Sequence, residues 1–209
     1  MAFCASTEEP GLRPRRLAAV RTITMDVAHP QRRAAERLIE GVYLATFDAR
    51  LHEHFPTLIG VTDSAGEVIA VAGCRFAASD RLFLESYLDE PVETALSRRL
   101  GAPIERNQIG EIGSLASAGG GAAVTLFAAL ARHLDTAGVR FAVATATGRL
   151  RRAFSAFGLC DGELAKADPA RAPRGADWGR YYENEPAVLY GRVAQGCARL
   201  APTLMAARS

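Results

Sequence analysis

Residues 109–146 read IGEIGSLASAGGGAAVTLFAALARHLDTAGVRFAVATA: a strand-like run, a glycine-rich turn, an alanine-rich helical run and a second strand-like run. We predict strands over residues 109–116 and 141–145, and between them a helix over residues 122–137 that Gly138 ends. A helix between two strands carries the chain back across the sheet, so the two strands are predicted to be parallel neighbours. The stretch therefore indicates an α/β domain.

The residues before this stretch predict further strands. Residues 22–27 alternate apolar and polar side chains, which is typical of a half-buried strand, and His29-Pro30 then opens a predicted helix that runs to about residue 47. Residues 58–62 and 68–76 are apolar runs joined by a short turn, which predicts an antiparallel hairpin. The first half of the chain thus favours antiparallel pairing.

The rest of the chain supplies more helices and a last strand. Helices are predicted from Pro91 to about Leu100 and over residues 149–157, and residues 165–177 are predicted to be a polar loop. A strand over residues 187–193 and a short C-terminal helix follow. The predicted fold class is α/β (α+β), with a mixed, mostly antiparallel central sheet covered by helices on both faces.

Composition and charge exclude several classes of protein. The chain has 209 residues, which suits a loose tail over residues 1–18 and a single domain over residues 19–209. The net charge of +2 does not indicate a nucleic-acid partner. We expect a cytoplasmic protein with no transmembrane segment, because no apolar run is long enough to span a bilayer. No metal site is predicted, since His52 and His54 show no further ligand spacing.

The glycine run Gly119-Gly120-Gly121 lies between a predicted strand and a predicted helix. Bare backbone amides and the positive end of a helix dipole at this place can hold a phosphate group. The alternative is a flexible turn with no ligand. The spacing is not that of a dinucleotide-binding fold and the lysine of a P-loop is missing, so the pyrophosphate of a pantetheine carrier fits the turn better.

The run from Glu111 to Leu159 resembles the two consecutive cofactor motifs of GNAT acyltransferases. The resemblance implies a GNAT-like fold in which the strand before the glycine turn splays from its neighbour and a thioester of coenzyme A or of acyl carrier protein lies in the gap. It places the donor on these residues: Leu115, Ala116, Ser117, Gly119, Gly120, Gly121, Ala122, Thr147, Arg149 and Arg152. For the two arginines, the alternative is a solvated helix face.

A wider resemblance, from about His29 to Val193, is to the thermostable hemolysin family. It rests on four ordered blocks: LFLESYLDEPVE at 82–93, EIGSLA at 111–116, ATAT at 144–147 and WGRYYE at 178–183. Ser114 departs from the asparagine that is usual in the family. The pattern is also similar to acyl-homoserine-lactone synthases, but the arginine that follows their strand glutamate by three residues is replaced here by Ser114.

Candidate catalytic residues follow from the needs of thioester aminolysis, which are a base for the amine and a donor for the oxyanion. Glu85 and Glu111 are the candidate bases, with a slight preference for Glu85. Glu111 has a structural alternative, a pairing with Arg75, which the lactone-synthase similarity also marks as a site residue. The usual GNAT tyrosine is replaced by Phe154, and Tyr182 is the candidate substitute.

The predicted function is an acyltransferase that moves an acyl group from acyl-CoA or acyl carrier protein to a small-molecule amine such as an amino acid or amino alcohol. The similarity to lactone synthases suggests a long-chain acyl group and makes acyl carrier protein a candidate partner. Two alternatives stay open: a membrane-active protein, and an acyl-CoA-binding module without catalysis. A continuous sheet with no gap between its strands would contradict the enzyme hypothesis.

Overall fold

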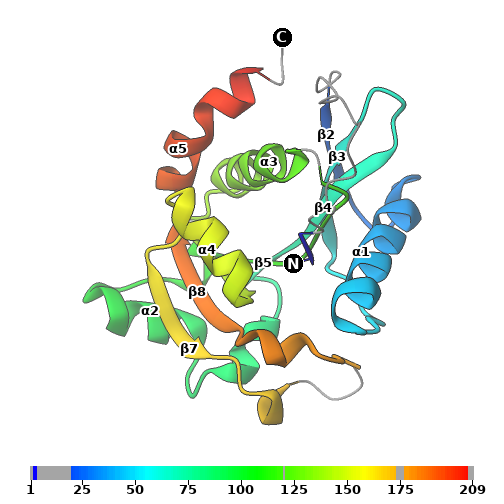
Figure 1. Cartoon of the computed structure of the whole chain (residues 1–209). Helices are drawn as coiled ribbons and strands as arrows, with labels where there is room; N and C mark the ends of the chain where they lie inside the picture. The colour runs from blue at the N-terminus through cyan, green and yellow to red at the C-terminus, as the bar shows by residue number, and fades with distance from the viewer. Residues whose placement is uncertain (1, 4–19, 120, 173–176, 207–209) are drawn as a thin grey trace.

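A single sheet organises the structure, a computed structural model that describes residues 2–3, 20–119, 121–172 and 177–206 (Figure 1). Its strands are β1 (Ala2–Phe3), β2 (Arg21–Met25), β3 (Thr57–Thr62), β4 (Val68–Phe76), β5 (Ile109–Ser117), β6 (Phe141–Ala146), β7 (Gly162–Lys166) and β8 (Ala187–Arg192). The spatial order is β2-β3-β4-β5-β6-β8-β7, and β1 pairs with β5. Apart from β5 with β6 and β1 with β5, all pairs are antiparallel, so the predicted mixed, mostly antiparallel sheet is confirmed.

Helices cover both faces of this sheet. They are α1 (Arg32–Phe47), α2 (Val92–Leu100), α3 (Ala122–Thr136), α4 (Gly148–Ala156) and α5 (Val193–Ala206), with 3₁₀ turns at Phe83–Tyr87, Arg106–Gln108, Pro169–Arg171 and Tyr181–Asn184. One core packs α3, α4 and α5 on one face, while two further cores pack α1, α2 and the first 3₁₀ turn on the other. Figure 1 shows α1 apart from the α3 to α5 group, across the sheet.

The helix ends follow the glycine signals in the sequence. Gly138 after α3 and Gly158 after α4 have φ of +76° and +65°, a left-handed conformation that costs glycine little and ends each helix. The parallel pairing of β5 with β6 through α3 is also as predicted.

The predicted polar loop over residues 165–177 is partly wrong. Residues Gly162–Lys166 form β7, an edge strand that pairs antiparallel with β8. The segment GELAK carries no β-branched or aromatic side chain and lies at the sheet edge with no fully buried residue, so no strand pattern is visible in the sequence. Of the predicted loop, residues 173–176 lie outside the described residues, as does most of the predicted tail over residues 1–18.

Strands β5 and β6 part halfway along their length. They pair only from Ile109 with Phe141 to Ile112 with Ala144, whereas β5 continues to Ser117 along β4. The gap that the GNAT resemblance implies between adjacent strands is therefore present. Beside its far end, the backbone of β1 pairs with Ala116 and Ser117. Because β4 already occupies one edge of β5 at these residues, β1 lies on the edge that faces the gap.

A bulge in β5 lies where the two strands diverge. Between the pairs Val71 with Ala116 and Gly73 with Gly113, β5 has two residues, Ser114 and Leu115, while β4 has only Ala72. Ser114 has φ of +49°, which is unusual for a residue other than glycine. Asparagine tolerates this conformation better than serine does, so the backbone gives a physical reason for asparagine at this position.

We expect Ser114→Asn and Ser114→Gly to raise the free energy of unfolding by about 0.5–1 kcal/mol, because both residues tolerate a positive φ. Ser114→Val should lower it by about 1–2 kcal/mol, since a β-branched residue is strained there. Urea denaturation measures both effects. The control is Thr24→Asn on β2, an exposed strand residue without a positive φ, where asparagine should give no gain. Equal gains at both positions would contradict the strain at Ser114.

Candidate functional site

A cleft opens on the α1 side of the sheet, at the divergence of β5 and β6. Its volume is about 170 Å³. Its walls come from α1, the segment before β3, β4, the first 3₁₀ turn, β5, β6 and the aromatic segment near residue 180: Tyr43, Leu51, His52, Glu53, Phe55, Arg75, Phe83, Glu111, Ile112, Gly113, Ser114, Thr145, Trp178 and Tyr181. Aromatic rings thus surround one arginine and one buried carboxylate.

Glu111 is the buried acid of this cleft, with 2% of its surface exposed. Its carboxylate accepts hydrogen bonds from the backbone amides of Phe83 (2.9 Å) and Leu84 (3.0 Å), and Arg75 Nε lies 3.6 Å from Oε2. Burial raises the pKa of Glu111 to about 7, although the two amides and Arg75 act in the opposite direction. A carboxyl group with a pKa near neutral can exchange a proton with a substrate at physiological pH.

Glu85 lies in a different environment. Its side chain accepts hydrogen bonds from the amides of Leu82 (2.8 Å) and Val92 (3.1 Å), and Arg106 donates to both of its oxygens at 2.7 and 2.9 Å. Burial alone would raise the pKa of Glu85, but the hydrogen bonds from Arg106, Val92 and Leu82 outweigh it and lower the pKa to about 2. Glu85 is absent from the cleft lining and is part of an open cavity with Arg106 and Glu93. This arrangement joins the 3₁₀ turn to α2.

Tyr182 is not among the residues that line the cleft. Its hydroxyl is 2.6 Å from that of Tyr87, and burial raises the pKa of both phenols. The cleft itself is lined by the neighbouring Tyr181, whose hydroxyl donates to the carbonyl of Thr145 (3.4 Å). The Trp178 ring packs against Tyr181 and Tyr182, with distances between ring centroids of 5.3 and 6.2 Å.

The glycine turn leads directly into α3. Gly119 and Gly121 have φ of +102° and +80°, and the amide of Gly119 donates to the hydroxyl of Ser117 (3.2 Å). Gly120 lies outside the described residues. Leu115, Ala116 and Ser117 are buried on β5 before the turn, and Ala122 is buried at the start of α3. Gly121 directly precedes α3, so it lies at the positive end of the helix dipole.

The other predicted donor residues lie at the start of α4. Thr147 is buried and precedes the helix, and Arg149 and Arg152 are exposed on it. Neither arginine lines the cleft or the apolar cavity described next.

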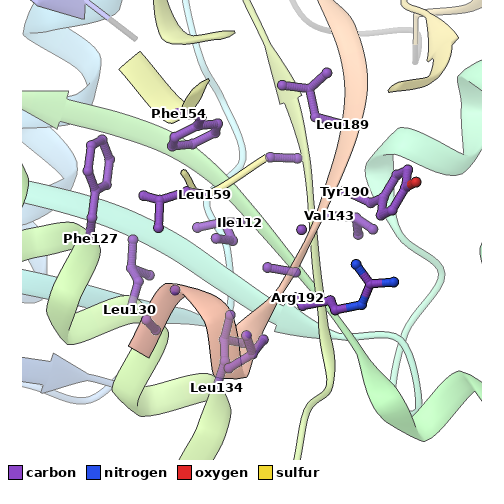
Figure 2. Close-up of a pocket in the computed structure, with 16 residues that line it drawn as sticks. Ile112, Phe127, Leu130, Leu134, Val143, Phe154, Leu159, Leu189, Tyr190 and Arg192 are labelled. Atoms are coloured by element: carbon purple, nitrogen blue, oxygen red, sulfur yellow. The ribbon is translucent and has the colours of Figure 1, made fainter. Parts of the chain in front are cut away.

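An apolar cavity of about 60 Å³ lies among β5, β6, β8, α3, α4 and α5 (Figure 2). Its side chains are mostly aliphatic or aromatic, including Phe127, Leu130, Phe154, Leu159 and Leu189. Ile112 lines both this cavity and the cleft. The apolar cavity and the polar cleft therefore approach each other at the residue where β5 and β6 part.

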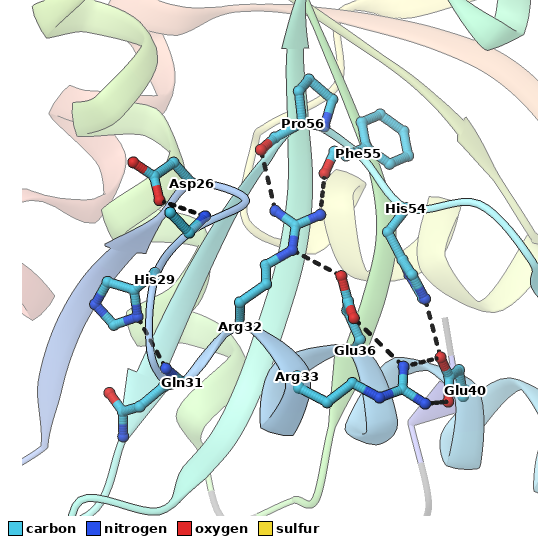
Figure 3. Close-up of polar contacts among 11 residues, drawn as sticks. Asp26, His29, Gln31, Arg32, Arg33, Glu36, Glu40, His54, Phe55 and Pro56 are labelled. Carbon is cyan, nitrogen blue, oxygen red and sulfur yellow. Dashed lines mark hydrogen bonds and ion pairs between the residues drawn. The ribbon is translucent and has the colours of Figure 1, made fainter.

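Phe55 is a cleft residue that the sequence does not mark. Its ring lies against Gly73 and Gly113, where an added Cβ atom would come within 2.4 Å of it, and the Arg75 guanidinium lies 4.5 Å from the ring centroid. Buried Arg32 on α1 donates to the carbonyls of Phe55 (2.6 Å) and Pro56 (3.0 Å), as Figure 3 shows. Arg32 thus positions Phe55, which in turn supports Arg75.

A network of charges on α1 holds Arg32 in place. Arg32 Nε donates to Glu36 (2.8 Å), Arg33 bridges Glu36 and Glu40, and His54 Nε2 lies 3.0 Å from Glu40 (Figure 3). The network ties the segment before β3 to the helix. The contact of Arg32 with Phe55 joins residues 23 positions apart, so no local sequence pattern predicts it.

Neither a metal site nor a membrane-spanning helix is found in the described part of the chain. No group of three or more His, Cys, Asp or Glu side chains there could hold a metal ion. Among the same residues, no helix combines the length and apolar character that a membrane crossing requires.

Known structures share this fold. The CoA-dependent acyl-homoserine lactone synthase BjaI is 14% identical, with 90% of this chain and 89% of BjaI covered and a TM-score of 0.61. FeeM, an N-acyl amino acid synthase from uncultured soil microbes, is 15% identical over 86% of this chain and 94% of FeeM, with a TM-score of 0.59. TofI is 14% identical, with 86% of this chain and 96% of TofI covered and a TM-score of 0.59. The fold is therefore GNAT-like, as predicted.

No curated protein matches the chain in sequence. At the family level there is a match, to the family described as thermostable hemolysin, over residues 25–197. This span includes the whole cleft, the glycine turn and the four blocks at 82–93, 111–116, 144–147 and 178–183. The chain belongs to the thermostable hemolysin family.

Proposed function

We propose that the protein is an N-acyltransferase that moves an acyl group from a thioester donor to a small-molecule amine. The observation that carries the proposal is the position of Glu111, a buried acid with a pKa of about 7, at the point where β5 and β6 part. The names of two relatives of the same fold support it, since BjaI is a CoA-dependent acyl-homoserine lactone synthase and FeeM is an N-acyl amino acid synthase.

In the proposed reaction, the carboxylate of Glu111 takes a proton from the bound ammonium group. The free amine nitrogen then attacks the thioester carbonyl carbon, and a backbone amide near Leu115, beside the bulge, stabilises the resulting oxyanion. The carbon–sulfur bond breaks, the amide forms, and the thiolate leaves. The second proton of the attacking nitrogen passes to the thiolate or to solvent. A thiol is acidic enough to leave without a dedicated acid, which suits Phe154 in place of tyrosine.

Glu111 is a better candidate base than Glu85, although the sequence slightly favours Glu85. Glu85 is held ionised by Arg106 and two amides and lies outside the cleft. A carboxylate with a pKa near 2 is a weak proton acceptor, so we assign Glu85 a structural role. Arg75 is proposed to stabilise Glu111 through their ion pair. Tyr182 is proposed to support the aromatic residues that line the cleft, through its hydrogen bond with Tyr87.

The donor is proposed to lie along the open edge of β5. Its pantetheine arm would run beside Leu115, Ala116 and Ser117, and its phosphate would rest on the turn that starts α3, with Gly119, Gly120, Gly121 and Ala122. Thr147, Arg149 and Arg152 remain candidate contacts from the start of α4. A donor in this place must displace β1, which pairs with the same edge.

The acyl chain is proposed to enter the apolar cavity beyond Ile112. Apolar surface in this cavity would bury methylene groups, each of which contributes about 0.8 kcal/mol. Either acyl-CoA or acyl carrier protein could present such a chain, and both donors are cytoplasmic compounds, in keeping with the predicted location.

Thiol release tests the function directly. Purified protein would be mixed with acyl-CoA or acyl carrier protein of several chain lengths and a pool of amines, and free thiol and acyl-amide would be measured. Amine-dependent thiol release supports the proposal. Protection against thermal unfolding by acyl-CoA without release would instead indicate the acyl-CoA-binding module. Lysis of erythrocytes with neither activity would indicate the membrane-active protein.

The rate should depend on pH through Glu111. We expect kcat/KM to fall about tenfold per pH unit below pH 7, because protonated Glu111 cannot accept a proton. The folded pKa is higher than the ordinary value of 4.5, so this group's contribution to stability falls as pH rises from 4.5 to 7. Rate and urea denaturation profiles from pH 5 to 9 check both effects. A rate independent of pH over this range would contradict the assignment.

A further inference from the structure

Three hydrogen-bond donors in the cleft have no hydrogen-bond partner among the described residues. They are Nε of Arg75, the hydroxyl of Thr145 and the indole Nε1 of Trp178, and all three atoms are buried. Their residues come from β4, from β6 and from the segment before the last 3₁₀ turn, yet all line the same cleft. Arg75 Nε has an ion pair with Glu111 at 3.6 Å but no hydrogen bond. Buried polar groups are nearly always hydrogen-bonded, so three such donors in one cleft indicate a missing acceptor.

An oxygen-rich anion would satisfy these donors. One arginine and two neutral donors around a single space match the two oxygens and four lone pairs of a carboxylate. Stacking on Phe55 fixes the Arg75 guanidinium at 4.5 Å from the ring centroid, so this donor is preorganised. An uncharged alcohol would satisfy at most part of this set.

The same cleft also offers a place for a positive charge. The carboxylate of Glu111 lines it, together with the aromatic faces of Tyr43, Phe83 and Tyr181. Aromatic rings and a carboxylate attract an ammonium group. The cleft therefore places an acid and an arginine next to each other, which suits a ligand that carries a positive and a negative charge close together.

We propose that the cleft binds a free α-amino acid as a zwitterion, with its carboxylate on Arg75, Thr145 and Trp178 and its ammonium group at Glu111. This inference rests on the proposed function and narrows it, since it selects amino acids over amino alcohols as the acyl acceptor. Binding of the zwitterion brings a net charge of zero into the cleft, and Arg75 and Glu111, which already form an ion pair at 3.6 Å, each gain a second partner of opposite charge.

Trp178 provides a direct test of binding, because it is the only tryptophan of the chain. Its fluorescence would be titrated with alanine, leucine and phenylalanine and with the amino alcohol of each, with and without coenzyme A. We expect a saturable change with at least one amino acid and binding at least about tenfold weaker for its amino alcohol, which lacks the charged acceptor. Equal affinity for both, or no change with any amino acid, would overturn the proposal.

A variant of one donor tests the geometry. Thr145→Val keeps the shape of the side chain and removes the hydroxyl, and it should weaken amino-acid binding by about tenfold without changing amino-alcohol binding. Thr24→Val, at an exposed position of β2, is the matched control and should change neither. An unchanged amino-acid affinity in Thr145→Val would contradict the contact.

The activity assay separates failure of this inference from failure of the proposed function. If thiol release occurs but amino alcohols react as well as amino acids do, the function stands and the zwitterion site is wrong. If amino acids bind at Trp178 but no amine supports thiol release, the site stands and the transferase is wrong.

Discussion

Glu111→Gln should lower the rate of acyl transfer by at least about 100-fold, which is the effect of losing a general base. Glutamine has nearly the same shape but cannot accept a proton at neutral pH. It also places an amide NH₂ where the backbone amides of Phe83 and Leu84 donate, so some loss of stability is expected as well. The measurement is kcat/KM for thiol release at pH 8, normalised to the folded fraction.

The matched control is Glu85→Gln. This residue is also a buried glutamate that accepts two backbone amides, but it lies outside the cleft. We expect Glu85→Gln to reduce stability and to retain most of the rate per folded molecule. Acyl-CoA should protect both variants against thermal unfolding, since neither residue is a proposed donor contact. A large rate loss in Glu85→Gln together with a near-normal rate in Glu111→Gln would reverse the assignment.

Arg106→Ala should lower the free energy of unfolding by about 3 kcal/mol, because it leaves the buried carboxylate of Glu85 without its cation. The effect also depends on pH. The pKa of Glu85 is lowered to about 2 in the folded protein, so its stabilising contribution is present above pH 4.5 and is lost as the pH falls toward 2. The variant should therefore lose less stability than the wild type over this acid range, as urea denaturation between pH 2 and 7 would show.

The chain contains an exposed pair that serves as the control. Arg98 and Glu90 lie 2.6 Å apart, but the Arg98 side chain is 78% exposed. We expect Arg98→Ala to change the free energy of unfolding by less than about 1 kcal/mol, as is usual for surface ion pairs. Equal losses in Arg98→Ala and Arg106→Ala would show that burial of Glu85 does not set the size of the effect.

Sequence alone predicts the fold well where periodicity is strong. The run from Ile109 to Ala146 contains a strand, a glycine turn, a helix and a strand, and each of these elements is present in the structure. Strand β7 is missed because an exposed edge strand needs no apolar alternation. The separation of β5 from β6 was predicted from the family resemblance alone. No local sequence pattern shows where a strand stops pairing with its neighbour.

The site was harder to predict than the fold, for a physical reason. Glu85 and Glu111 are both glutamates in apolar surroundings, and what distinguishes them is Arg106, 21 positions from Glu85. A pKa depends on such distant partners and on burial, and neither is local in the sequence. Phe55 and Thr145 were likewise not predicted, because their importance comes from cross-strand neighbours and from an unpaired hydroxyl.

The contact of Phe55 with Gly73 and Gly113 has a consequence for how the family can diverge. Both glycines leave space that the ring fills, so a larger residue at either one must be accompanied by a smaller residue in place of Phe55. The three positions should therefore change together among relatives, and the shape of the cleft that Phe55 and Gly113 line should change with them. Three linked residues would then set the shape of the cleft in each member of the family.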